Sequence, residues 1–140
     1  MSFVLFGKTT IAAAGTILGT RYRDRGMGGT SNLCVIANFL YGSGGTAAKA
    51  YVQTSFDGGL TWNDIMCFAF TTSAAVAILN AVPNVAVATP ITPSDGALAD
   101  NTVADGVFGT DFRVKLITTG TYAGLSSISL MSEGIPLSPL

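Results

Sequence analysis

The side chains that most often carry catalysis are scarce in this chain. It contains no histidine, so the commonest general base, the commonest metal ligand and the usual pH switch are missing. Cys34 and Cys67 stand inside apolar runs, an environment typical of inert buried thiols, although a disulfide between adjacent strands stays open. The spacing of Asp57 and Asp64 does not single out a glycosidase pair. We therefore expect neither an enzyme nor a cofactor.

Acidic residues gather late in the chain, in the segments SDGALAD and ADGVFGTD. Aspartate and carbonyl oxygens in loops of this kind are ligands that calcium prefers. The spacing does not match the EF-hand loop, no glutamate closes a site, and Asp-Gly is also an ordinary turn signal. Calcium is thus an alternative to plain turns, with these aspartates as candidate ligands: Asp95, Asp100, Asp105 and Asp111.

One local motif has a definite spacing. Ser55, Asp57, Gly59 and Trp62 stand in SFDGGLTW, which matches S-x-D-x-G-x-x-W at every fixed position. Aspartate accepts backbone N–H bonds inside turns, and glycine takes positive φ at no steric cost. The motif resembles the Asp-box, which repeats in sialidase propellers, is scattered through other β proteins, and is architectural there. Because it occurs once here, the resemblance implies a structural hairpin and not a propeller.

Strands and turns must position these residues. Period-2 alternation bounded by Gly, Asn, Asp and Ser recurs along the chain and predicts short strands. The expected strands span residues 2–6, 17–23, 33–41, 49–55, 61–71, 112–118 and 125–131, and the expected long loops span 21–32 and 90–105. No capping residue precedes a long amphipathic stripe, which argues against helices.

The alternation also predicts which side chains share a sheet face. It places Trp62, Asp64 and Met66 on one face of their strand. We predict an all-β fold, with residues 1–140 forming a single β-sandwich or jelly-roll-like domain that has long loops. Residues 132–140 contain two prolines and are expected to form an extended tail, docked either on a neighbour or on its own domain.

The surface is short of charge. Charged residues make up 11% of the chain against a usual value of about 25%, and the formal net charge is −1. Without a basic field or a long uninterrupted apolar segment, neither nucleic acid nor a membrane is an expected partner, and residues 1–19 are interpreted as mature structure. A neutral surface is typical of one covered by partner proteins. The candidate interface residues are Arg21, Arg23, Arg25, Ile135, Leu137 and Leu140.

Two hairpin sequences resemble a known class of proteins. VQTSFDGGLTWNDI (52–65) and RVKLITTGTYAG (113–124) look like segments of small virion proteins of tailed bacteriophages. The resemblance implies a structural protein of the virion, assembled in the host cytoplasm, and it transfers no site residues. The leading interpretation is a capsid decoration subunit that binds the major capsid protein or other virion subunits as a homo-oligomer, with a trimer favoured.

Two alternatives stay open. Within the same class, the chain is a head–tail junction or tail subunit. From a different class comes a carbohydrate-binding module, which needs two or more coplanar aromatic faces exposed on one side of the molecule. The aromatic residues considered for that platform are Trp62, Tyr22, Tyr41, Tyr51 and Tyr122.

Overall fold

The computed structural model describes residues 2–24, 32–133 and 137–139, and the regular structure in these ranges consists of β-strands without helices. The candidate interface residues Arg25, Ile135 and Leu140 lie outside the described residues. Within the described ranges, no helix has the length and apolar character needed to cross a membrane. The all-β prediction is confirmed.

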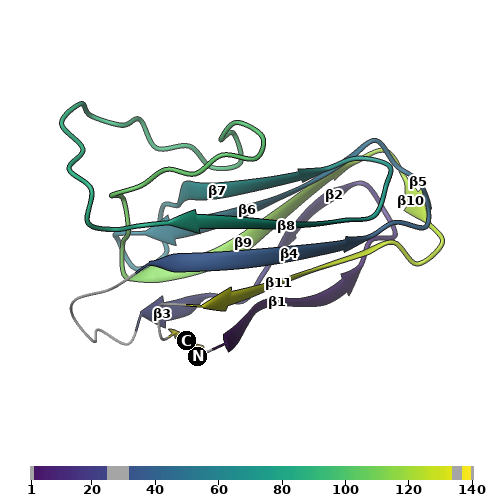
Figure 1. Ribbon diagram of the computed structural model, residues 1–140, viewed down its shortest axis with the longest axis horizontal. Helices are drawn as coiled ribbons and strands as arrows, with labels where there is room; N and C mark the ends of the chain where they lie inside the picture. Colours follow the sequence, from purple (N-terminus) through teal and green to yellow (C-terminus); the bar gives the residue numbers. More distant parts are fainter. Residues whose placement is uncertain (1, 25–31, 134–136, 140) are drawn as a thin grey trace.

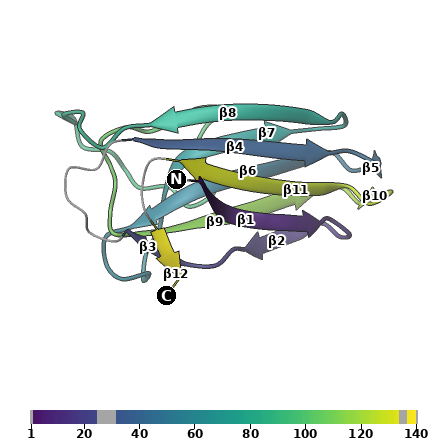
Figure 2. The same ribbon diagram turned by 60° about the horizontal axis from the view of Figure 1, so that its bottom comes forward.

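The strands in chain order are β1 (Ser2–Thr10), β2 (Gly15–Leu18), β3 (Tyr22–Asp24), β4 (Leu33–Leu40), β5 (Ser43–Gly44), β6 (Ala47–Ser55), β7 (Asn63–Phe70), β8 (Ala75–Ala81), β9 (Asp111–Thr119), β10 (Tyr122–Ala123), β11 (Ser127–Glu133) and β12 (Leu137–Pro139). They form two stacked antiparallel sheets (Figures 1 and 2). The first sheet has the order β1-β11-β4-β8. The second has the order β12-β3-β9-β6-β7, with β2 also paired to β9, and β5 and β10 form a short ribbon at one end.

The strands pair in nested order, so that the first strands of the chain pair with the last ones and the middle strands pair with each other. Strand β1 pairs with β11, β2 and β3 pair with β9, β4 pairs with β8, and β6 pairs with β7. Two further pairings, β11 with β4 and β9 with β6, join these strand pairs into the two sheets. This connectivity is the jelly-roll arrangement of a β-sandwich.

The core fills the space between the two sheets. In β4, every second residue is fully buried (Leu33, Val35, Ala37 and Phe39), while the residues that alternate with them are exposed or half-buried, as period-2 alternation requires. Phe39 stacks on Phe70 of the second sheet with ring centroids 5.1 Å apart and meets Tyr122 edge-on at 5.8 Å. One continuous cluster of buried residues therefore joins both sheets.

Strand β7 differs from the predicted facing. Val52 pairs with Met66, but the next residue, Gln53, pairs with Asp64, so Ile65 is the extra residue of a β-bulge. Ile65 and Met66 both belong to the core, whereas Asp64 lies beside Gln53 on the outer face of the second sheet. The expectation that Asp64 shares a face with Met66 is wrong because the bulge reverses the alternation.

The chain after β11 returns to its own domain. Ser132 and Glu133, expected in the extended tail, belong to β11. Leu137–Pro139 form β12, an extended strand paired antiparallel with β3 at the edge of the second sheet. The tail is thus docked on the second sheet of its own chain, although the side chain of Leu137 is not among those described.

Candidate functional site: the loop end of the sandwich

The predicted Asp-box residues lie in the hairpin between β6 and β7. The Ser55 hydroxyl accepts a hydrogen bond from the Gly59 N–H at 2.9 Å. The Asp57 carboxylate accepts bonds from the Thr61 N–H at 2.9 Å and the Thr61 hydroxyl at 2.6 Å. These bonds from Thr61, with a further one from Ser55, lower the pKa of Asp57 to about 2. Gly58 takes a φ of +71°, so the turn requires a residue that tolerates the left-handed region.

Trp62 closes this hairpin. Its indole Nε1 donates to the Gly59 carbonyl at 3.1 Å. The Arg113 guanidinium of β9 lies 4.3 Å from the centre of the indole ring, which is a cation–π distance. Trp62 is half-buried, and Arg113 covers one face of its ring. The motif therefore fixes the hairpin on the outer face of the second sheet.

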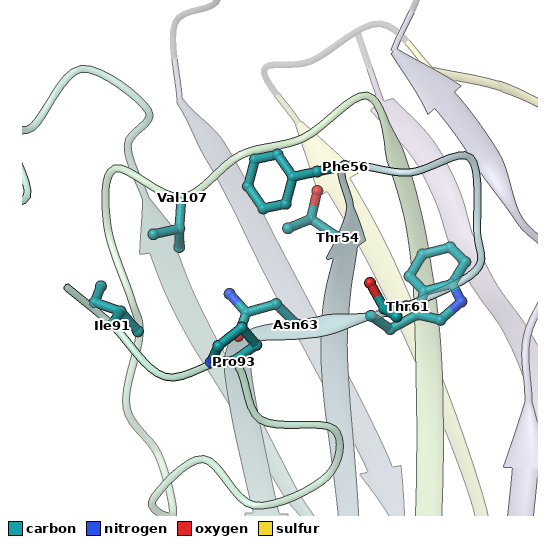
Figure 3. Close-up of a pocket in the computed structure, with 8 residues that line it drawn as sticks. Thr54, Phe56, Thr61, Asn63, Ile91, Pro93 and Val107 are labelled. Carbon is teal, nitrogen blue, oxygen red and sulfur yellow. The ribbon is translucent and has the colours of Figure 1, made fainter.

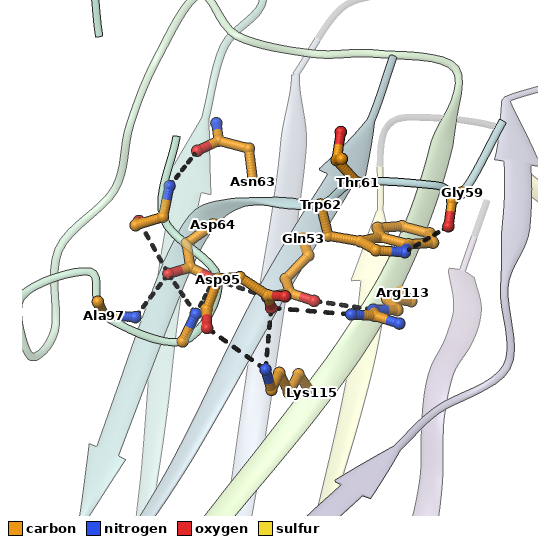
Figure 4. A network of polar contacts seen from close by, with 12 residues as sticks. Gln53, Gly59, Thr61, Trp62, Asn63, Asp64, Asp95, Ala97, Arg113 and Lys115 are labelled. Atoms are coloured by element: carbon orange, nitrogen blue, oxygen red, sulfur yellow. Dashed lines mark hydrogen bonds and ion pairs between the residues drawn. The ribbon is translucent and has the colours of Figure 1, made fainter. Parts of the chain in front are cut away.

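Asp64, which directly precedes the bulge at Ile65, anchors the long connection between β8 and β9. Asp64 is 1% exposed, yet its carboxylate accepts bonds from the Gln53 amide at 2.8 Å and from the N–H groups of Gly96, Ala97 and Leu98 at 2.8, 2.9 and 3.1 Å (Figure 4). A concave row of backbone N–H groups is an anion-binding nest, here filled by the protein's own carboxylate. This nest holds the loop against β6 and β7.

A second aspartate ties the same loop to β9. Asp95 accepts bonds from the Gln53 amide at 2.6 Å and from Lys115 Nζ at 3.0 Å, while Gln53 Oε1 accepts from Arg113 Nε at 2.8 Å. Burial alone raises the pKa of Asp95, but the bonds from Gln53 and Lys115 outweigh it and hold the pKa below its ordinary value. A continuous polar chain thus links the loop through Gln53 and Arg113 to Trp62 (Figure 4).

The far part of the connection covers the free edge of β7. The Cys67 N–H donates to the Thr102 carbonyl at 3.1 Å, and the Ala104 N–H donates to the Ile65 carbonyl at 2.9 Å. The side chain of Asn101 accepts from the Ala69 N–H at 3.1 Å. These bonds satisfy an edge strand that would otherwise be open to pairing with another chain.

An apolar pocket of about 120 Å³ lies between the hairpin and this ordered connection (Figure 3). Its lining combines hairpin residues with loop residues: Thr54, Phe56, Thr61, Trp62, Asn63, Ile91, Pro93 and Val107. Phe56 at its rim is 66% exposed, and Leu60 at the hairpin tip is 85% exposed. A preformed concave apolar site beside exposed large side chains is suited to receiving an apolar side chain of a partner.

The calcium candidates are not brought together. Asp95 pairs with Lys115, and Asp100 pairs with Lys49 at 2.8 Å. Asp105 accepts from the Val82 N–H at 2.8 Å, and Asp111 lies fully buried elsewhere. Among the residues that the structure describes, no three His, Cys, Asp or Glu side chains form a group suited to a metal ion. Each aspartate serves a separate structural contact.

Two of the arginines expected at an interface, Arg21 and Arg23, contact their own domain. Arg21 Nε and Arg23 Nε each lie 3.4 Å from the buried Asp111 carboxylate, and Arg21 also donates to the Gly58 carbonyl at 2.8 Å. Asp111 Oδ2 has no hydrogen-bond partner, so its charge is met by the ion pair with Arg21. Both arginines therefore brace the hairpin and the start of β9.

The remaining chemical candidates are buried or separated from one another. Tyr51 is 4% exposed and Tyr122 is 1% exposed, so neither offers a ring face to a sugar. Burial, followed by the neighbouring Cys67, raises the pKa of Tyr51 to about 12. Cys34 and Cys67 are free thiols on β4 and β7, which belong to different sheets. A scan of protein-family models and a comparison with curated proteins both give no match to this chain.

The apolar pocket residues other than Trp62 were not predicted as a site. Phe56, Ile91, Pro93 and Val107 stand within turns and loops, where the sequence analysis sought only polar chemistry. Large apolar residues in segments that otherwise contain Gly, Asp, Ser and Thr were the available signal, because such residues have no reason to face water unless something covers them.

Proposed function

We propose that this chain is a structural subunit of a bacteriophage virion, acting as a decoration protein that reinforces the head shell. The observation that carries the proposal is the apolar pocket at the loop end, with Phe56 and Leu60 exposed beside it. An apolar side chain of a major capsid protein inserts there, and the fixed walls of the pocket reduce the entropy lost on binding.

The distribution of charge supports a mechanical role. Arg21, Arg23, Lys49, Arg113 and Lys115 all form ion pairs within the domain. These five cations thus hold loops and hairpin together, which reduces the free charge that their surfaces present to a partner. Many identical weak contacts on a shell sum to strong attachment, so a single small pocket suffices for each subunit.

The test is co-sedimentation of the purified chain with phage particles from the organism that carries its gene. We expect the wild-type chain to pellet with the particles. The variants Phe56→Ser and Ile91→Ser should stay in the supernatant while keeping the wild-type circular dichroism spectrum.

The matched control is Leu125→Ser. Leu125 is 82% exposed and follows the short strand β10, at the end of the sandwich away from the pocket (Figure 1). The Leu125→Ser variant should pellet with the particles like the wild type. Equal pelleting of all variants would reject the pocket as the docking site, and failure of the wild type to pellet would reject the decoration role.

A further inference from the structure

One strand position at the edge of the second sheet is only half filled. Strands β2 and β3 both pair with β9 on the side opposite β6, so they lie end to end along it. Strand β12 lies on the far side of β3, with Leu137 opposite Asp24 and Pro139 opposite Tyr22, and it runs in the direction of β2. Among the described residues, no strand lies on the corresponding side of β2 (Figure 2). We call this position beside β2 the open lane.

Strand β2 presents backbone hydrogen-bonding groups to the open lane. The Gly19 N–H donates to the Val114 carbonyl at 2.8 Å, in the same register as the pairs between β2 and β9. Successive residues of an antiparallel strand direct their N–H and C=O groups alternately to one side and to the other. Because the groups of Gly19 face β9, those of Leu18 and Thr16 face the open lane. Two N–H donors and two C=O acceptors are therefore available there to an extended segment.

A depression of about 290 Å³ lies beside this edge. Residues 5–9 of β1 line it on one side, and residues 17–20 in and after β2 line it on the other. The buried Phe6 ring reaches from β1 to the second sheet, since a Cβ added at Gly19 would come within 2.9 Å of it. Leu18 at the rim is 55% exposed. The open lane thus combines a backbone edge with an apolar surface that can receive side chains.

The depression also carries a cation without an ion pair. Lys8 lines it and is exposed. All the other cations that the structure describes form ion pairs within the domain: Arg21, Arg23, Lys49, Arg113 and Lys115. A carboxylate on a bound segment would therefore complement Lys8 without competing with an existing ion pair.

We propose that the open lane binds an extended, acidic segment of a partner polypeptide, which adds to β2 as a further strand. Alternating N–H and C=O groups along a strand edge match the backbone of another strand, and an apolar depression beside them gives sites for its side chains. Strand β1 is the less suitable edge, because its pairing register with β11 shifts twice. The contact is separate from the loop-end pocket, so it goes beyond the proposed function.

The test is an NMR titration of the isotope-labelled full chain with a synthetic peptide. The probe is a heptapeptide in which valine alternates with threonine, the central threonine is replaced by glutamate, and both ends are blocked. The amide signals of Thr16 and Leu18 should shift and their hydrogen exchange should slow, since both N–H groups gain an acceptor. The Ile17 N–H, which faces β9, should change less. The same peptide methylated at every backbone nitrogen keeps its side chains but loses its donors, so it should not bind.

Two substitutions separate the backbone edge from the charge. Leu18→Pro removes an N–H that faces the open lane, a place where edge strands tolerate proline, and it should weaken peptide binding by about fivefold or more, as expected for one lost hydrogen bond. Leu18→Val is the matched control, because it keeps the N–H, and it should bind the peptide with nearly the wild-type affinity. Lys8→Glu should reverse the charge preference, so that a peptide with a central lysine binds better than the peptide with glutamate.

The absence of amide shifts at millimolar peptide would overturn the strand addition, and so would shifts centred on another strand edge. Equal binding of the methylated peptide would overturn the backbone pairing, and this comparison holds whether or not Leu18→Pro folds. Equal binding of the glutamate and lysine peptides to the wild type would overturn the acidic character of the partner. Because these titrations use no phage particles, the open lane and the decoration role can fail separately.

Discussion

Replacing Asp64 with asparagine should destabilise the domain strongly although the side chain keeps its shape. The carboxylate accepts bonds from Gln53 and from three backbone N–H groups, those of Gly96, Ala97 and Leu98. A hydrogen bond to a charged group contributes about 1.5–3 kcal/mol, against about 1 kcal/mol for a neutral one. Asparagine is neutral, so each hydrogen bond that it still accepts is weaker than the bond to the carboxylate. Its NH₂ group also faces at least one N–H group that needs an acceptor. The variant no longer buries a charge, and the desolvation cost that it avoids offsets part of this loss. The free energy of unfolding should therefore fall by about 3 kcal/mol.

The assay is urea unfolding followed by the fluorescence of Trp62, with Asp100→Asn as the matched control. Asp100 pairs with Lys49 at 2.8 Å but is 55% exposed, so its loss should change stability by less than about 0.5 kcal/mol. Amide hydrogen exchange gives a local readout, since the N–H groups of 96–98 should lose protection in Asp64→Asn. A change below about 1 kcal/mol with these amides still protected would refute the anchoring role of Asp64.

Three further predictions concern the hairpin and the thiols. The folded-state pKa of Asp57 is about 2 against an ordinary 3.8, so its contribution to stability is complete above about pH 4 and is lost as the pH falls through 2. Urea titrations at a series of pH values should show this loss of stability. In Asp57→Asn, stability should depend less on pH over this range. Gly109→Ala should lower the free energy of unfolding by about 1–3 kcal/mol, because a Cβ at this position would clash with the Ser55 carbonyl. Gly7→Ala is the control, since a Cβ there would contact no other atom. Equal urea midpoints for the two variants would contradict this prediction. Burial raises the pKa of Cys67, so a thiol reagent at pH 8 should modify it only after unfolding, as peptide mass mapping will reveal.

Alternation predicted most strands because each faces the core on one side. In β9, Phe112, Val114 and Leu116 point inward as the period-2 pattern required. Strand β8 was not predicted, since AVAILNA is apolar on both sides and gives no alternation of polar and apolar residues. Its outward-facing residues Val76 and Ile78 are each 62% exposed, so the pattern does not alternate because this strand is apolar on its exposed side as well.

The candidate site was predictable only where its contacts are local. The bonds from Ser55 and Asp57 reach residues within four positions, so SFDGGLTW alone predicted the hairpin. Asp64 instead accepts bonds from amides more than thirty positions away, and it faces them because of the adjacent bulge at Ile65, which no local pattern marks. The loop of residues 90–105 was expected from the sequence, but the contacts that anchor it were not: Asp95 accepts from Lys115, and Asp105 accepts from the Val82 N–H. Ile91 and Pro93 of the same loop line the pocket.

The most direct test of the decoration role is a quantitative inventory of purified particles. Phage particles from the organism that carries this gene would be banded on a density gradient, and their proteins measured by mass spectrometry against labelled standards. The account predicts that the chain bands with the shell at a fixed, high ratio to the major capsid protein. Its absence from the particles, or its presence in only a few copies, would contradict the decoration role.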